Sequence, residues 1–152
     1  LPTAFCGMFK KRYNMKQKAI LLAFLLATTV TFTSLAQGSE ETAVRACLEE
    51  YMSGDGNRME KAFHPSATMK YIDAQTGEFK DVPIADFIAR AKANTSKSQR
   101  KIEIVSVNIE GNAANGKIRI ETEKVILYDY MNMLKVNGEW KIVSKIFSRK
   151  DK

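Results

Sequence analysis

Residues 128–147 read YDYMNMLKVNGEWKIVSKIF. Two runs rich in aromatic and β-branched residues flank the dipeptide Asn137-Gly138. Asn-Gly between two such runs is the strongest short sequence signal for a two-residue β-hairpin turn. The stretch therefore predicts an antiparallel hairpin near the end of the chain.

The segments before this hairpin also favour strands. Apolar and polar residues alternate over 67–73, and Gln75-Thr76-Gly77 then predicts a turn into a short strand around 78–82. Further strands are predicted over 102–109 and, after a turn at Gly111-Asn112, over 117–130. The second half of the chain is thus predicted to be an antiparallel meander.

Three helices are predicted around the first strands. Ser39 can cap a helix whose apolar residues recur at three- and four-residue spacing, namely Val44, Cys47, Leu48, Tyr51 and Met52. Asn57, with Glu60 as a capping-box partner, predicts a second short helix that ends at His64 before Pro65. A third helix is predicted to begin at Pro83 and to fade over 94–99. This order of helices and strands is typical of the α+β class.

The first 36 residues have the layout of a secretory signal peptide. Lys16 and Lys18 precede an apolar run over 19–30, and small residues Ser34 and Ala36 fill the last positions before a cleavage site. We expect cleavage between Ala36 and Gln37, with residues 1–14 lying upstream of the signal. The alternative, a membrane anchor, would need an apolar run of about 20 residues. Residues 37–152 are accordingly expected to form one exported domain, periplasmic or secreted, with no membrane attachment after cleavage.

Charge and composition exclude several classes. Hydrophobic residues make up 45% and charged residues 27% of the 152, which excludes a disordered or integral membrane protein. The net charge is +7, but five basic and no acidic residues lie in 1–36, so residues 37–152 carry only about +2. Together with the lack of a nucleic-acid-binding motif, this argues against a nucleic-acid partner. Cys47 is the only cysteine after the cleavage site, and it is expected to be a buried packing residue.

Residues 128–147 resemble the terminal hairpin of the putative lumazine-binding family. Residues 51–55 (YMSGD) and 63–68 (FHPSAT) are similar to the helix-to-strand passage of the same family. That family is a branch of the nuclear-transport-factor-2-like superfamily, alongside SnoaL-like polyketide cyclases and ketosteroid isomerases. The resemblance implies a cystatin-like cone, in which a strongly curved antiparallel sheet wraps around three helices and leaves a pocket at the open end. It also implies a homodimer formed through the outer face of the sheet.

His64 is the only histidine in the sequence. Zinc and related metals usually require two or more His or Cys ligands, so neither a metal site nor a cofactor is predicted. A histidine before a proline at the end of a helix is usually structural. Because its pKa lies near neutrality, it can also act as a general base. The resemblance places it near the mouth of the pocket.

Asp73 and Tyr71 are candidates on the first strand. The resemblance to ketosteroid isomerases places Tyr71, not an acid, at the position of their aspartate base. Asp73 lies two residues further along on the same face. Since Asp73 also precedes the predicted turn at 74–77, a backbone role in that turn is the favoured alternative.

The C-terminal strands contribute Asp129, Tyr130 and Lys145. Strand alternation allows only one of Asp129 and Tyr130 to face the pocket, and Asp129 is favoured. Asp129 could pair with Lys145 across the hairpin, or it could act on a substrate with a perturbed pKa. Tyr128 is a further candidate for the lining, and Trp140 is expected in the core or a dimer interface. The predicted ligand-binding residues are Tyr51, Met69, Tyr71, Asp73, Asp129, Tyr130 and Lys145, and the candidate catalytic residues are His64, Asp73 and Asp129.

The leading functional hypothesis is an exported domain that binds a small apolar or aromatic molecule, with no assignable catalysis. An isomerase-, cyclase- or hydrolase-like enzyme with an Asp or His base and Tyr donors is the alternative. A third reading is a protein-interaction module that uses the outer face of the sheet.

Overall fold

The computed structural model describes residues 38–94 and 99–152, so the predicted signal peptide and its cleavage site lie outside the described residues. A first helix covers residues 38–52. The other helices are α2 (Gly56–Ala62) and α3 (Ile84–Ala93). The strands are β1 (Phe63–Ile72), β2 (Phe79–Pro83), β3 (Lys101–Glu110), β4 (Ala113–Glu121), β5 (Val125–Val136) and β6 (Glu139–Asp151).

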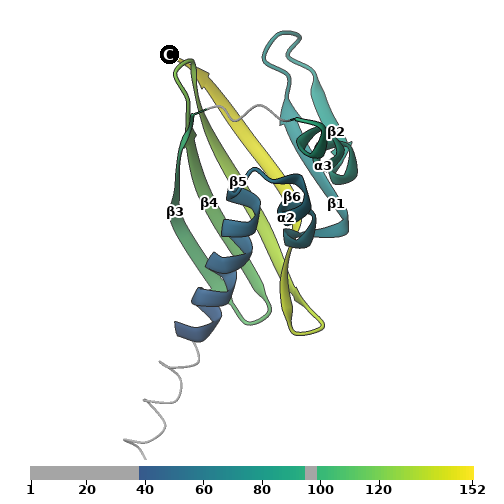
Figure 1. The fold of residues 1–152 in the computed structure, drawn as a ribbon, viewed down its shortest axis with the longest axis vertical. Coiled ribbons are helices and arrows are strands. Elements are labelled where there is room, and N and C mark those ends of the chain that lie inside the picture. The colour runs from purple at the N-terminus through teal and green to yellow at the C-terminus, as the bar shows by residue number, and fades with distance from the viewer. Residues whose placement is uncertain (1–37, 95–98) are drawn as a thin grey trace, which may run out of the picture. The chain divides into compact units, whose positions relative to one another are not determined.

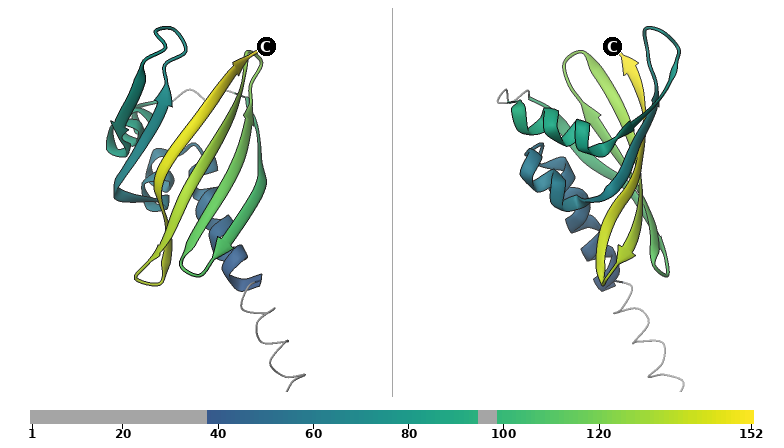
Figure 2. Two further views of the ribbon diagram at one scale, coloured as in Figure 1. Left: turned by 180° about the vertical axis from the view of Figure 1, so that it is seen from behind. Right: turned by 90° about the vertical axis from the view of Figure 1, so that its right-hand side faces the viewer.

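These strands form one curved sheet in the order β2-β1-β6-β5-β4-β3. β1 and β6 pair in parallel, whereas the other neighbouring pairs are antiparallel. The helices lie on one side of the sheet, within its curve, as the two views of Figure 2 show. In Figure 1 the first helix crosses β3, β4 and β5, while α3 lies beside β1 and β2. The α+β cone predicted from the sequence is therefore confirmed.

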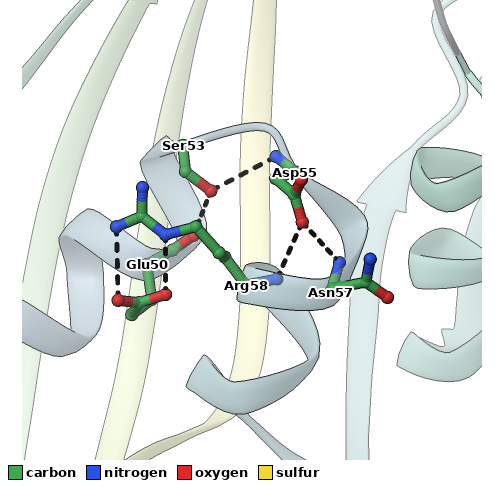
Figure 3. Close-up of polar contacts among 5 residues, drawn as sticks. All are labelled: Glu50, Ser53, Asp55, Asn57 and Arg58. Carbon is green, nitrogen blue, oxygen red and sulfur yellow. Dashed lines mark hydrogen bonds and ion pairs between the residues drawn. The ribbon is translucent and has the colours of Figure 1, made fainter.

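The turn between the first helix and α2 is built by Asp55, which corrects the predicted cap at Asn57. Oδ1 of Asp55 accepts the backbone N–H groups of Asn57 (2.8 Å) and Arg58 (3.0 Å), as Figure 3 shows. These two bonds satisfy donors that have no partner within the helix. Arg58 then binds Glu50 through two nitrogens at 2.9 and 3.2 Å, which fixes α2 against the first helix.

α2 also ends earlier than the sequence predicts. The chain is already extended at Phe63 (φ −91°, ψ 145°), so His64 and Pro65 belong to β1 and not to the end of a helix. A proline disfavours helical geometry in the residue before it, and here the extended conformation starts one residue earlier still. The pairing of β1 with β6 shifts register between Phe63 and Thr68, around the proline.

The strand predicted over 117–130 is two strands in the structure. β4 ends at Glu121, and the chain reverses over residues 122–124 before β5 begins. The hydroxyl of Thr122 accepts the backbone N–H groups of Lys124 (3.3 Å) and Val125 (3.1 Å). This turn depends on a threonine side chain, so the usual Gly, Pro and Asn signals are missing from it.

The hairpin of β5 and β6 forms where the sequence predicts it. Asn137 (φ 52°) and Gly138 (φ 86°) both have positive φ, as a two-residue hairpin turn of the favoured type requires. Val136 pairs with Glu139, and Lys135 pairs with Trp140. Trp140 is buried in the core, as expected.

The core lies between the helices and the inner face of the sheet. Leu48 of the first helix, Met131 of β5 and Ile142 of β6 are fully buried there. The helix approaches β4 so closely that a Cβ added at Gly116 would lie 2.7 Å from a methyl carbon of Leu48. Cys47, expected to be buried, is half-buried against this core. Burial raises the pKa of its thiol to about 11. No helix in the described part of the chain is long and apolar enough to cross a membrane.

Candidate functional site

The register of β5 decides which polar residues face the helices. Asp129 pairs with Ile118 and Phe147, and its side chain is only 1% exposed. Tyr130 lies on the opposite face, where Lys117 lies over its ring at 5.3 Å. Tyr128 shares that outer face, because Lys117 also lies over its ring. Strand alternation thus removes Tyr130 and Tyr128 from the predicted pocket lining and leaves Asp129 inside, as favoured from the sequence.

Three buried polar groups meet on the inner face, and we call Tyr51, Asp129 and Lys145 the inner-face cluster. Tyr51, from the first helix, donates its hydroxyl hydrogen to Oδ2 of Asp129 at 2.5 Å. Nζ of Lys145, on β6, lies 2.6 Å from Oδ1 of the same carboxylate. Tyr51 is 7% and Lys145 3% exposed. The pairing of Asp129 with Lys145, one of the alternatives from the sequence, is therefore present.

Burial controls the protonation chemistry of the cluster. It raises the pKa of Tyr51 well above the usual range, and the negative charge of Asp129 raises it further, so Tyr51 remains a hydrogen-bond donor. Burial also lowers the pKa of Lys145, although the carboxylate of Asp129 opposes this effect. Within residues 38–94 and 99–152, Oδ1 of Asp129 accepts no hydrogen bond of good geometry, so the charge of Lys145 is its partner. A buried polar oxygen held in this way is costly to leave unpaired.

Aromatic side chains surround the cluster. Nζ of Lys145 lies 4.7 Å from the ring centroid of Phe147 and 5.5 Å from that of Tyr51. Tyr71 of β1 stacks on Phe147 at 4.9 Å with an interplanar angle of 26°. Met69, opposite Lys145 in the sheet, is buried on the same face. The predicted placement of Met69 and Tyr71 on the inner face agrees with these contacts.

The cluster lies where the core gives way to less buried side chains. Met131, one step along the inner face from Asp129, is fully buried. Leu127, one step in the other direction, is only half-buried, as are Phe147 and Tyr71. Ile102 and Ile120 continue the row of Leu127 across β3 and β4. This end of the inner face, with Leu127, Tyr71 and Phe147, is apolar and partly accessible, so its aromatic rings can contact an apolar or aromatic ligand.

The Asp73 side chain caps the turn that follows β1 and does not line the inner face. Its Oδ1 accepts the backbone N–H groups of Gln75 (2.9 Å) and Thr76 (3.0 Å) in the turn after β1. These bonds hold the pKa of the Asp73 carboxyl below its usual range. The structure therefore supports the alternative reading of Asp73 as a turn residue.

His64 lies on β1, and its ring is also engaged locally. Nδ1 accepts the backbone N–H of Ser66 at 3.2 Å and lies 2.8 Å from the Ser66 hydroxyl. His64 borders a shallow, mainly apolar cleft of about 290 Å³ between α3 and the start of β1. Among the described residues, the hydrogen bonds of the His64 ring go to Ser66 and not to the inner-face cluster.

A second, more polar cleft of about 630 Å³ lies between α3 and the end of the chain segment that leads into α2. Arg90, Arg100 and Phe87 are among its lining residues. Neither of these two clefts is lined by Tyr51, Asp129 or Lys145. No group of three or more metal-ligating side chains is present among the residues that the structure describes.

Phe147, like Leu127, is a residue of this site that sequence reasoning missed. It lies two residues after Lys145 on β6, so strand alternation places both side chains on the same face. Strand alternation, which separates Asp129 from Tyr130, also predicts that Phe147 faces inward.

Solved structures of NTF2-like proteins have the same fold as this chain. An NTF2-like protein of unknown function from Shewanella baltica OS155 is 27% identical, with a TM-score of 0.67. The match covers 74% of this chain and 94% of that one. A second NTF2-like protein of unknown function, from Methylobacillus flagellatus KT, is 26% identical, with a TM-score of 0.66. That match covers 74% of this chain and 93% of the other. The chain is thus a nuclear-transport-factor-2-like domain.

The family follows from a more specific match. The model of the putative lumazine-binding family matches residues 39–148. The chain belongs to this family, as the resemblance of its terminal hairpin implied. Among curated proteins, it is 29% identical over 117 residues to "Aldolase FrzH" from Cladobotryum sp. That match covers 72% of this chain and 90% of the aldolase.

Proposed function

We propose that this domain binds a small planar molecule at the half-buried end of its inner face. The observation that carries this proposal is the stacked pair Tyr71 and Phe147, which lies next to a buried carboxylate and ammonium. A stacked aromatic pair offers a flat apolar surface, and a few fixed polar groups beside it can orient a ring with its own polar atoms. Membership of a family described as putative lumazine-binding supports a heteroaromatic ligand of this kind.

Native mass spectrometry of the protein purified from its source tests the proposal. We expect a molecule that is bound without a covalent bond and dissociates on unfolding, and we expect added lumazine to occupy the same site. Phe147→Leu removes the stacked ring while keeping apolar volume, and it should weaken binding at least about tenfold, the equivalent of one aromatic stacking contact.

Ile146→Leu is the matched control, because Ile146 is the neighbouring residue on the outer face and is 44% exposed. It should leave binding unchanged. If both variants bound equally well, the ligand would lie elsewhere and the proposal would fail.

Carbonyl chemistry is a second candidate function, favoured by a specific observation. The relative named as an aldolase supports an enzyme of this type. The inner-face cluster supplies an amine, a carboxylate and a phenol within hydrogen-bond distance, which are groups that can move protons during C–C bond chemistry. This candidate is a form of the enzymatic alternative in which Asp129 is the base, and not Asp73, whose carboxylate accepts hydrogen bonds within its turn.

We also propose that the domain is exported and that two copies form a homodimer. Residues 15–36 support secretion of a domain that begins at Gln37. The outer face of the sheet, with exposed Leu134 and Ile146, supports a homodimer through that face.

A further inference from the structure

Lys145 has an unusual position for a lysine. Its amine is buried in the domain, and its only described ion-pair partner in residues 38–94 and 99–152 is Asp129. Lysine is rarely fully buried, and a buried ion pair gives little net stability relative to apolar residues of similar volume. A contribution to stability therefore does not explain why Lys145 is buried. A chemical role for its amine does.

The two oxygens of Asp129 have different partners in the cluster. Oδ1 lies against the Lys145 amine, whereas Oδ2 receives the hydroxyl hydrogen of Tyr51. Asp129 can therefore take a proton from Lys145 while Tyr51 holds its other oxygen in place. An amine that can pass its proton to a fixed carboxylate has the arrangement of a nucleophile with its general base.

The surroundings also favour a neutral amine. Nζ lies over the rings of both Tyr51 and Phe147, and Lys145 is buried away from bulk water. Desolvation is one of the ways in which proteins activate a lysine as a nucleophile, and it lowers the pKa of Lys145 here.

The amine is within reach of the proposed ligand surface. Phe147 lies two residues beyond Lys145 on the same face of β6, and its ring is half-buried. The Phe147 ring centroid lies 4.7 Å from Nζ, so a ligand that rests on this ring has the amine as its neighbour.

We propose that Lys145 is a nucleophilic amine that forms an imine with a ketone or aldehyde held on the half-buried end of the inner face. This inference rests on the proposed function, because the carbonyl compound must first bind there. The substrates are then carbonyl compounds, and the inner-face cluster catalyses imine formation with them.

The reaction balances without an oxidant or a reductant. Asp129 takes a proton from the Lys145 ammonium, and the electron pair on Nζ forms a C–N bond to the carbonyl carbon while a proton moves from nitrogen to oxygen. Asp129 then returns its proton to the carbinolamine hydroxyl, which leaves as water as the C=N bond forms. The product is a protonated imine, so the positive charge beside Asp129 is retained.

Reaction with 2,4-pentanedione tests this inference on the full folded protein. A 1,3-diketone condenses with a free amine, with loss of one water, to give a stable enaminone that absorbs in the near ultraviolet. We expect the first adduct to form at Lys145, as identified by intact mass and peptide mapping, before other lysines react. Lys145→Met should abolish this early adduct.

Lys117 provides the matched control. It also lies over two tyrosine rings, at 5.1 and 5.3 Å, but on the outer face of the sheet. Lys117→Met should leave the early adduct intact. The double variant Asp129→Asn/Lys145→Met, which leaves no buried charge unpaired, repeats the test if Lys145→Met does not fold. Mapping of the unchanged protein decides the question without any variant.

The outcomes separate this inference from the proposed function. If lumazine binds reversibly but the diketone first modifies exposed lysines, Lys145 is not a nucleophile and the binding function stands. If Lys145 is modified first but no planar ligand is retained, the amine chemistry stands and the binding function fails.

Discussion

Among single residues, Asp129 and Lys145 form the ion pair on which the proposed site depends. Both side chains are almost completely buried, and each provides the compensating charge for the other. Breaking such a pair from one side leaves an uncompensated charge in an apolar environment, whereas neutral replacement of both partners does not. The stability of single and double variants therefore measures how deeply the pair is buried in solution.

Lys145→Met is expected to lower the free energy of unfolding by about 3–5 kcal/mol, because Asp129 would remain buried and charged. The double variant Asp129→Asn/Lys145→Met should recover most of this loss, since its asparagine still accepts the Tyr51 hydrogen bond. Urea denaturation monitored by circular dichroism measures both values. Equal stability of the single variant and the unchanged protein would mean that water reaches the pair.

Residue-scale features were predictable from the sequence where strand alternation applies. It correctly separated Asp129 from Tyr130 and placed Met69 and Tyr71 inside. The contact between Tyr51 and Asp129 joins residues 78 positions apart, and no local pattern encodes such a contact. Sequence reasoning could name both residues as candidates, but only the packed fold brings them together.

At the scale of elements, the position of the first helix depends on its contacts with the β5–β6 hairpin. Glu40 accepts a hydrogen bond from Lys135 at 2.5 Å through Oε1 and one from Trp140 at 2.9 Å through Oε2. These contacts fix the start of the helix against the end of the sheet that lies opposite the half-buried end. They thereby help to position Tyr51, further along the same helix.

Glu40 gives this contact a pH dependence. The hydrogen bonds from Lys135 and then Trp140 hold the pKa of Glu40 below its ordinary value of 4.5. The unfolded chain therefore binds a proton more readily, so the contact stabilises the fold above pH 4.5 and is lost as the pH falls through the lower folded pKa. Glu40→Gln should make stability depend less on pH in this acidic range, as measured by thermal unfolding at a series of pH values. A pH dependence identical to that of the unchanged protein would show that the contact does not form in solution.

The sequence signals for elements were reliable where turns use glycine or asparagine. Asn137-Gly138 predicted the β5–β6 hairpin correctly, because both residues accept positive φ. The turn at Thr122 was missed because a hydroxyl group satisfies the backbone there. The predicted helix end at His64 was wrong because the bulged start of β1 already includes that residue.

At the scale of the whole molecule, the outer face of the sheet is the surface through which we propose that two copies pair. Leu134 and Ile146 are 41% and 44% exposed on this face. Ile146→Lys should convert the dimer to a monomer, because a buried ammonium without a partner opposes association. Light scattering coupled to size-exclusion chromatography measures the mass. A monomeric mass for the unchanged protein across micromolar concentrations would contradict the proposed pairing.

The proposed export also belongs to this scale. Protein secreted by the source organism, or recovered from its periplasm, should begin at Gln37, since Ser34 and Ala36 fit the positions before a signal-peptidase cut. N-terminal sequencing gives the answer directly. Exported material that retains Lys16 and Lys18 would contradict the predicted cleavage.

We propose that the inner face of the cone, at its half-buried end, is the ligand site. Methyl-labelled protein titrated with lumazine and followed by nuclear magnetic resonance tests it most directly. Leu127 and Ile102 report on the inner face, and Leu134 and Ile146 report on the outer face. We predict that the methyl signals of Leu127 and Ile102 shift in proportion to bound ligand while those of Leu134 and Ile146 do not. Shifts confined to the outer face, or no shift at saturating lumazine, would show that the inner face is not the ligand site.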